Sequence, residues 1–158
     1  MKVKFGNYIE KVKEHKPKKI LLQVPEGLKT RALEISSELK NKTEAEIIIS
    51  GEPCYGACDL RLDEAKLLGC DLILHFGHID FGVKSEIPVV YVSVEVDFGI
   101  DKSLEGELRR LKEDNINIYS SEPFRKSLDI LEKILENQGK KIGEKKIILG
   151  CSRPKARG

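Results

Sequence analysis

The sequence lacks tryptophan and any long apolar run, and it has only four cysteines among 158 residues. No apolar stretch reaches the roughly 20 residues that a membrane-spanning helix needs, and the N-terminus has no secretory apolar segment. Four cysteines are also too few for a disulfide scaffold in a chain of this length. These absences exclude a membrane protein and favour a cytoplasmic protein with reduced thiols.

An excess of charge of one sign is missing as well. The chain has 28 Lys and Arg residues against 26 Asp and Glu residues, which gives a formal net charge of +2. A nucleic-acid-binding face normally shows as a basic excess, so the composition gives no reason to expect nucleic acid as a partner. The length is that of one typical domain or two small ones, which is enough to bury a core.

The order of apolar and periodic segments predicts an α/β protein. Short apolar runs typical of buried parallel strands alternate with segments whose apolar residues recur at helical spacing. The expected strands are residues 18–24, 46–49, 71–74, 88–94, 116–119 and 146–149, and the expected helices are 28–40, 63–68, 104–113 and 124–137. Such an order implies parallel four-stranded sheets flanked by helices, in two consecutive Rossmann-like lobes.

The boundary between the lobes is expected near residues 96–102, where Gly99 and Asp101 interrupt the periodicity. This predicts a first α/β domain over residues 1–98 and a second over residues 99–158. The last residues, 154–158, neither complete a helix nor return to a sheet. The second domain is therefore expected to be incomplete and the chain to be truncated or proteolysed.

The segment 52–58, Glu-Pro-Cys-Tyr-Gly-Ala-Cys, is the most informative part of the sequence. It places Cys54 and Cys58 four residues apart after an expected strand, and Asp59 follows at once. Loops at the carboxyl ends of parallel strands are where α/β proteins build their sites. We interpret the loop as a candidate chemical centre, against the alternatives of small buried cysteines or a disulfide.

Other candidate residues follow neighbouring strands. Gln23 and Glu26 either contact a cofactor or position a substrate, or the segment is only the turn into the next helix, with Gly27 supplying a permissive backbone. His75 and His78 follow the third expected strand and either line the site or are structural.

Two further cysteines complete the set of thiols. Cys151 follows the last expected strand of the second lobe, as Cys58 follows a strand in the first, and Cys70 is interpreted as a core thiol. A closed tetrahedral zinc site is an alternative that would use Cys54, Cys58, Cys70 and His75. It would leave Cys151 unexplained.

Four motifs in this order resemble the diphthamide-synthesis enzymes, the 2-(3-amino-3-carboxypropyl)histidine synthase family. They are Gln23-Val-Pro-Glu-Gly-Leu28, Tyr55-Gly-Ala-Cys-Asp59, His75-Phe-Gly-His78 and Leu149-Gly-Cys151. The resemblance covers essentially the whole chain. It departs from the family pattern at Ile79, where a small hydroxyl residue is usual, and at Lys145-Lys146, where Gly-Gln is common.

The resemblance implies three related α/β domains, each of which donates one cysteine to a single [4Fe-4S] cluster. Cys58 would be the first ligand and Cys151 the second, and the third would lie in a domain that this chain lacks. Cys54 is either a spare ligand or a neighbour. The residues expected to contact the cofactor S-adenosylmethionine are Gln23, Glu26, Gly27 and His78, and no catalytic residue is assigned.

The implied reaction transfers the 3-amino-3-carboxypropyl group of S-adenosylmethionine to a histidine of translation elongation factor 2, the first step of diphthamide synthesis. It implies a reductant protein and a homodimer or family heterodimer. Arg61 stands where the local Cys-x3-Cys-x2-Cys motif of ordinary radical enzymes needs its third cysteine, which favours dispersed ligands. The alternatives are a non-catalytic partner subunit of the family and a zinc-binding structural domain. We expect the chain alone to be inactive.

Overall fold

The computed structural model describes residues 2–80, 82–97 and 102–148, and the chain divides into two compact units. One unit comprises Phe5–Val94, and the other joins Met1–Lys4 to Glu95–Gly158. The domain boundary after residue 98 stays a prediction. Cys151 and its motif lie outside the described residues.

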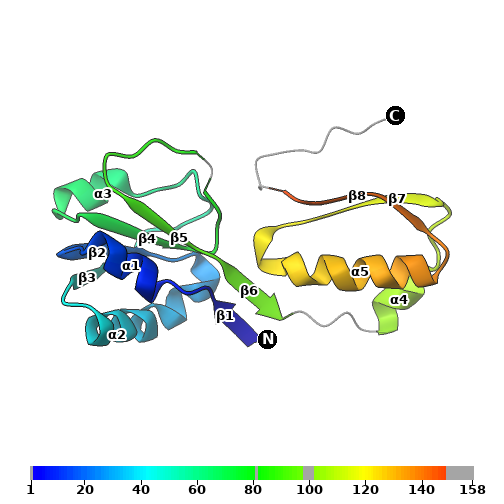
Figure 1. Ribbon diagram of the computed structural model, residues 1–158, viewed down its shortest axis with the longest axis horizontal. Helices are drawn as coiled ribbons and strands as arrows, with labels where there is room; N and C mark the ends of the chain where they lie inside the picture. Colours follow the sequence, from blue (N-terminus) through cyan, green and yellow to red (C-terminus); the bar gives the residue numbers. More distant parts are fainter. Residues whose placement is uncertain (1, 81, 98–101, 149–158) are drawn as a thin grey trace. The chain divides into compact units, whose positions relative to one another are not determined.

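A parallel four-stranded sheet with the order β3-β2-β4-β5 forms the centre of the Phe5–Val94 unit (Figure 1). Its strands are β2 (Lys19–Gln23), β3 (Glu46–Ile49), β4 (Leu72–Phe76) and β5 (Val89–Val92). Every residue of β4 is buried, as expected for a central strand that is covered on both faces. This unit confirms the predicted four-stranded α/β architecture.

Helices cover both faces of this sheet. The 3-10 helix η1 (Glu26–Arg31) and helix α2 (Ala32–Lys42) connect β2 to β3, and α3 (Leu62–Leu67) connects β3 to β4. These connections cross the sheet in opposite directions, and right-handed crossovers therefore place α2 and α3 on opposite faces (Figure 1). Under α3 the buried residues are Leu21, Ala65, Cys70 and Ile73, which confirms Cys70 as a core thiol.

Three elements were not expected from the sequence: β1 (Lys2–Phe5), α1 (Ile9–His15) and β6 (Val94–Asp97). The expected strand 88–94 corresponds to β5, and β6, which begins at Val94 and was not expected, pairs with β1 in a two-stranded sheet. Tyr8, just before α1, lies edge-to-face against Phe76 at 5.2 Å between ring centroids. The Tyr8 hydroxyl donates to Glu38 of α2 at 2.5 Å, which ties this N-terminal segment to the sheet unit.

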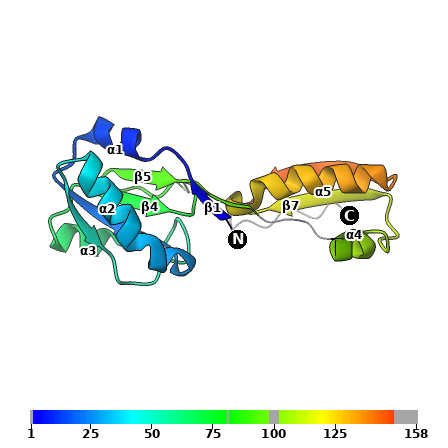
Figure 2. The same ribbon diagram turned by 90° about the horizontal axis from the view of Figure 1, so that it is seen from below.

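The second unit contains a two-stranded parallel sheet, β7-β8. Beyond most of β1 and β6, its elements are α4 (Lys102–Leu108), β7 (Asn115–Ser120), η2 (Glu122–Phe124), α5 (Arg125–Asn137) and β8 (Lys141–Ile147). Helix α5 packs along β7 and β8 (Figure 2) and buries Ile118, Leu128 and Leu135. Among the described residues of this unit the β7-β8 sheet has two strands, which correspond to the two expected at 116–119 and 146–149, and a four-stranded sheet in this lobe stays a prediction.

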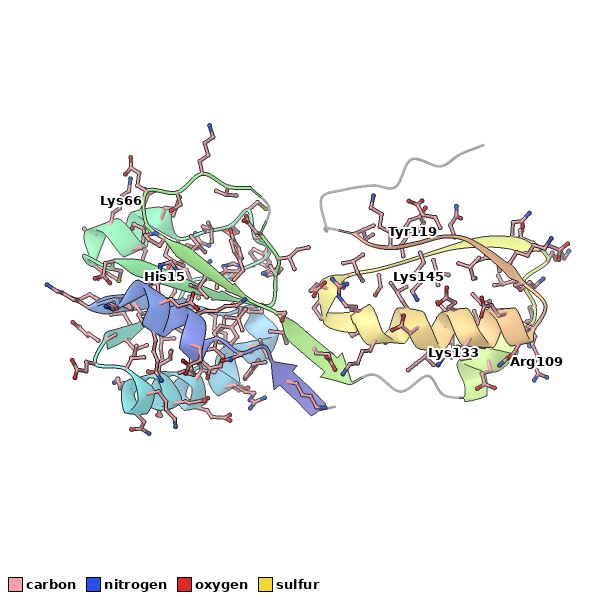
Figure 3. All side chains as sticks on the ribbon, viewed as in Figure 1. His15, Lys66, Arg109, Tyr119, Lys133 and Lys145 are labelled. Carbon is pink, nitrogen blue, oxygen red and sulfur yellow. The ribbon has the colours of Figure 1, made fainter. Side chains whose placement is uncertain are left out.

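Strand β8 begins at Lys141, five residues before the expected start at 146. Its first residues are mostly charged and exposed, and parallel pairing with β7 makes them a strand although they carry no apolar run. A register irregularity separates Ile116 from Ile118, where Glu144 N donates to Asn117 Oδ1 at 2.8 Å. Lys145 reaches from β8 to Asp129 and Glu132 of α5 (Figure 3).

No helix in the described part of the chain is both long enough and apolar enough to cross a membrane.

Candidate functional site

The carboxyl ends of three adjacent parallel strands bring the N-terminal motifs together. Gln23 is the last residue of β2, the cysteine loop follows β3, and His75 lies near the end of β4. The strand register places Gln23 opposite His75. The prediction that β4 ends at residue 74 is wrong, because the strand continues through Phe76 and buries His75 completely.

Lys29 of η1 holds the first half of the cysteine loop. Its Nζ donates to the carbonyl oxygens of Ser50 at 2.8 Å and Glu52 at 2.7 Å. Glu26 is exposed, with a carboxylate oxygen 4.0 Å from Lys29 Nζ. Gly27 is exposed and does not have a positive φ, so the expectation that it supplies a permissive backbone is wrong. The segment after β2 therefore forms a turn and, through Lys29, also holds the cysteine loop in place.

Asp59 and Arg61 hold the second half of the loop. The amide of Tyr55 donates to Asp59 Oδ2 at 3.2 Å, and the amide of Asp59 donates to the carbonyl of Gly56 at 3.0 Å. The Arg61 guanidinium donates to the Pro53 carbonyl at 2.8 Å and lies 3.5 Å from Asp59 Oδ1. The residue that breaks the three-cysteine motif is thus one that braces this loop.

The two thiols of the loop have different surroundings. Cys58 is exposed, whereas Cys54 is only 3% exposed and its Sγ lies 4.0 Å from His75 Nε2. Burial, assisted by the charge of Asp59, raises the pKa of the Cys54 thiol to about 11. Cys54, Cys58 and Cys70 are free thiols, so the disulfide alternative is wrong for these three.

Gln23 is fully buried and fixes the orientation of His75. Its Nε2 donates to the Asp59 carbonyl at 2.6 Å, and its Oε1 accepts from the amide of Arg61 at 3.4 Å. These partners set which end of the amide is oxygen. His75 Nδ1 lies 3.2 Å from that oxygen, which can only accept, so Nδ1 carries the proton and Nε2 carries the lone pair.

The lone pair of His75 faces a second imidazole. His75 Nε2 lies 2.9 Å from Nδ1 of half-buried His78. Burial, together with the proximity of His78, lowers the pKa of His75 to about 4, and burial also lowers the pKa of His78. Both rings are therefore neutral near pH 7. Tyr91 packs edge-to-face on His75 at 5.4 Å between ring centroids.

The three side chains that converge are Cys54, His75 and His78, whose possible ligand atoms all lie within 4.8 Å of one another. Cys58 joins no such group of three among the described residues, and Cys70 lies in the hydrophobic cluster under α3. The alternative of a four-ligand zinc site made of Cys54, Cys58, Cys70 and His75 is therefore wrong. Sequence reasoning missed the brace residues Lys29 and Arg61, since no pattern shows which carbonyls a long cation will reach.

A protein-family model described as a putative diphthamide synthesis protein matches residues 24–158 of this chain. The chain belongs to this family. Among curated relatives, the 2-(3-amino-3-carboxypropyl)histidine synthase of Pyrococcus horikoshii is 30% identical over 156 residues, which cover 91% of this chain and 45% of the relative. Subunit 1 of the corresponding enzyme from Dictyostelium discoideum is 32% identical over 158 residues, covering 93% of this chain and 33% of the relative.

Solved structures of the diphthamide synthesis family share the fold. The crystal structure of Dph2 from Pyrococcus horikoshii with a 4Fe-4S cluster superposes with a TM-score of 0.76 at 30% identity, covering 85% of this chain and 40% of that one. A second crystal structure of the same protein gives a TM-score of 0.76 at 29% identity. The chain thus spans less than half the length of these relatives.

Proposed function

We propose that this chain is part of a 2-(3-amino-3-carboxypropyl)histidine synthase and supplies Cys58 and Cys151 to a [4Fe-4S] cluster. In this proposal the enzyme transfers the 3-amino-3-carboxypropyl group of S-adenosylmethionine to a histidine of elongation factor 2. The observation that carries the proposal is the exposed thiol of Cys58, on a braced loop at the carboxyl edge of the sheet, in a chain of the diphthamide synthesis family.

The donor chemistry of the loop fits an iron–sulfur cluster. Thiolates hold such clusters, and Cys58 is the exposed thiol of the loop, whereas Cys54 faces the buried His75. Gly56 keeps the space beside the Cys58 sulfur open, since a Cβ at Gly56 would lie 3.4 Å from it. When bound, the cluster supplies the electron that breaks a carbon–sulfur bond of S-adenosylmethionine.

The residues around the loop divide into contact and positioning roles. Glu26 and Gly27 are exposed on η1, which supports the proposal that they contact the cofactor. In this proposal the carboxylate of Glu26, which lies 4.0 Å from Lys29 Nζ, faces a cationic group of the cofactor. His78 is half-buried and offers a neutral imidazole edge. Both amide ends of Gln23 are hydrogen-bonded within the protein, which supports a positioning role through Asp59 and His75.

The remaining proposals concern the whole protein. They are two α/β domains over residues 1–98 and 99–158, a cytoplasmic location, a reductant protein, and a homodimer or family heterodimer. Relatives named as subunit 1 support a family complex. The formal net charge of +2 supports recognition of elongation factor 2 by shape and local contacts, because a dominant electrostatic field would need a larger imbalance.

The test is a label-transfer assay under reduced, anaerobic conditions. The protein assayed contains this chain and has the full length of its relatives. Label from the carboxyl-labelled aminocarboxypropyl group should appear in elongation factor 2 and not in a version that lacks the target histidine. Cys58→Ala should abolish transfer, and Cys70→Ala, which removes a thiol buried under α3, should retain it. Equal labelling of both factors would contradict the assignment, and no transfer despite an intact cluster would favour the partner-subunit alternative.

A further inference from the structure

We propose that Cys54, His75 and His78 form a mononuclear site for a zinc-type divalent cation, separate from the proposed cluster ligand Cys58. One possible ligand atom from each residue lies within 4.8 Å of the other two. The facing atoms are the Cys54 sulfur, His75 Nε2 and His78 Nδ1. The site goes beyond the proposed transferase function and does not depend on it.

Two of the three separations between the candidate ligand atoms are close to those of a tetrahedral centre. Zinc–nitrogen bonds of about 2.0 Å and zinc–sulfur bonds of about 2.3 Å separate two nitrogen ligands by roughly 3.3 Å, and a nitrogen from a sulfur by roughly 3.6 Å. The corresponding separations here are 2.9 Å between His75 and His78 and 4.0 Å between Cys54 and His75. Shifts of a few tenths of an ångström would bring these two pairs to ligand geometry, and the Cys54–His78 pair, which lies within 4.8 Å, would have to close by up to roughly 1.2 Å.

The hydrogen bond of His75 to Gln23 is the feature that most favours a ligand role. A metal-binding histidine normally donates its other ring N–H to an oxygen acceptor, which fixes the tautomer and aims the lone pair at the metal. His75 Nδ1 donates to Gln23 Oε1, and Gln23 is itself held by the Asp59 carbonyl at 2.6 Å. This support is buried, so the lone pair of His75 is aimed at Cys54 and His78 before any cation arrives.

The backbone also prepares the site. His75 is on a central strand, and Cys54 is on the loop that Lys29 and Arg61 brace, so rigid elements carry two of the three donors. One thiolate and two neutral imidazoles match the preferences of zinc. Three protein donors leave a fourth position for water or another small ligand.

The proposal can be tested on the 158-residue chain, stripped of metal by a chelator and kept anaerobic with a phosphine reductant. Titration with Co²⁺ should give one bound equivalent, with tetrahedral d–d bands and a thiolate-to-cobalt charge-transfer band, and Zn²⁺ should displace it. Cys54→Ser should lose the charge-transfer band, and His78→Gln should lose the tight binding of Co²⁺. Gln23→Leu, which removes the support of His75, should weaken binding about 10- to 100-fold.

Three variants serve as matched controls. Cys58→Ser removes the exposed thiol of the same loop, Cys70→Ala removes another buried thiol, and His15→Gln removes an exposed histidine on α1 (Figure 3). All three should retain the cobalt spectrum. If circular dichroism shows that Cys54→Ser does not fold, the cobalt spectrum of His78→Gln tests the proposal instead.

The proposal is overturned if the folded chain gives no tetrahedral cobalt spectrum. It is overturned equally if the spectrum survives in Cys54→Ser or His78→Gln, or if it depends on Cys58. Because the cobalt signal needs neither iron nor S-adenosylmethionine, its loss leaves the Cys58 cluster proposal intact. A failed cluster reconstitution likewise leaves this site intact.

Discussion

His75 Nε2 and His78 Nδ1 lie 2.9 Å apart because the chain reverses at the glycine between them. Gly77 has a φ of +87°, and its amide donates to the Val92 carbonyl at 3.0 Å, so β4 ends against β5 and the next residues return toward the strand. The pairing of the two imidazoles is therefore a property of the backbone as much as of the side chains.

Replacing Gly77 with alanine should destabilise the protein and separate the two histidines. The positive φ is unfavourable for alanine, and the added Cβ would meet Pro25 Cγ at 2.9 Å. We expect a loss of about 2 to 3 kcal/mol in the free energy of unfolding, measured by urea denaturation. Gly82→Ala is the matched control, because Gly82 also has a positive φ but nothing lies near its Cβ position, and it should lose about 1 kcal/mol. Equal losses would contradict the role of Pro25.

Replacing Lys29 with methionine should loosen the cysteine loop. The substitution removes two charged hydrogen bonds to the carbonyls of Ser50 and Glu52 but keeps the aliphatic stem. We expect a cost of about 1 kcal/mol in the free energy of unfolding and a faster alkylation of Cys54 in the folded protein. Lys40→Met, at an exposed position of α2, should change neither quantity. An unchanged alkylation rate of Cys54 in Lys29→Met would show that the loop does not need Lys29.

In metal-free protein, stability should fall as the pH decreases from 6.5 toward 4. Burial lowers the pKa of His75 from 6.5 to about 4, so the unfolded chain binds more protons in this window, and the stabilisation present above pH 6.5 is lost as the pH falls. The contribution is at most about 3 kcal/mol. Urea denaturation across this range should give a shallower pH slope for His75→Gln than for the parent. The same slope in both proteins would exclude His75 as the titrating group.

Of the three cysteines in the described part of the chain, Cys58 should react first with a small alkylating agent at neutral pH. Its thiol is exposed, whereas burial raises the pKa of both Cys54 and Cys70 and shields their sulfur atoms. Mass spectrometry of peptides after brief exposure to iodoacetamide should show modification at Cys58 well before the other two. Urea-unfolded protein should show comparable rates at all three positions. Early modification of Cys54 in folded protein would contradict its burial.

The 158-residue chain by itself should not hold a complete, oxygen-resistant [4Fe-4S] cluster. Of its thiols, only Cys58 and Cys151 match the ligands that the family resemblance implies, and two thiolates leave part of the cluster unprotected. Iron and sulfide analysis with visible absorption after anaerobic reconstitution should show partial, air-sensitive loading. A full cluster that survives in air would contradict this ligand assignment.

The sequence predicted the existence of the strands better than where some of them begin and end. The strand 46–49 is reproduced residue for residue by β3, because a run of isoleucines between helix and loop has few alternatives. The end of β4 was missed because His75 looks polar, yet Gln23 gives it a buried partner across the strand pair. The start of β8 was missed because lysines carry no apolar signal, and only pairing with β7 defines it.

The motifs indicated which residues gather at the candidate site, but not their burial. The family resemblance distinguished Cys58 as a ligand from Cys54, but only the folded loop shows that Cys54 faces His75 while Cys58 is exposed. Cys70 was predicted correctly as a core thiol because it directly precedes a buried apolar strand. The roles of Lys29 and Arg61 depend on contacts between distant segments, which local patterns do not encode.

The single side chain of Gln23 contacts three groups in two distant segments of the chain: the carbonyl of Asp59 and the amide of Arg61 in the loop, and the ring of His75 on β4. Any fluctuation that lifts the loop breaks the same amide contacts that hold the imidazole. The loop and the end of β4 should therefore open as one cooperative unit, with hydrogen exchange rates that rise together. An enzyme built on this arrangement would lose the position of the Cys58 thiol and the orientation of the His75 ring in the same opening event. Both losses would occur at the rate of that opening.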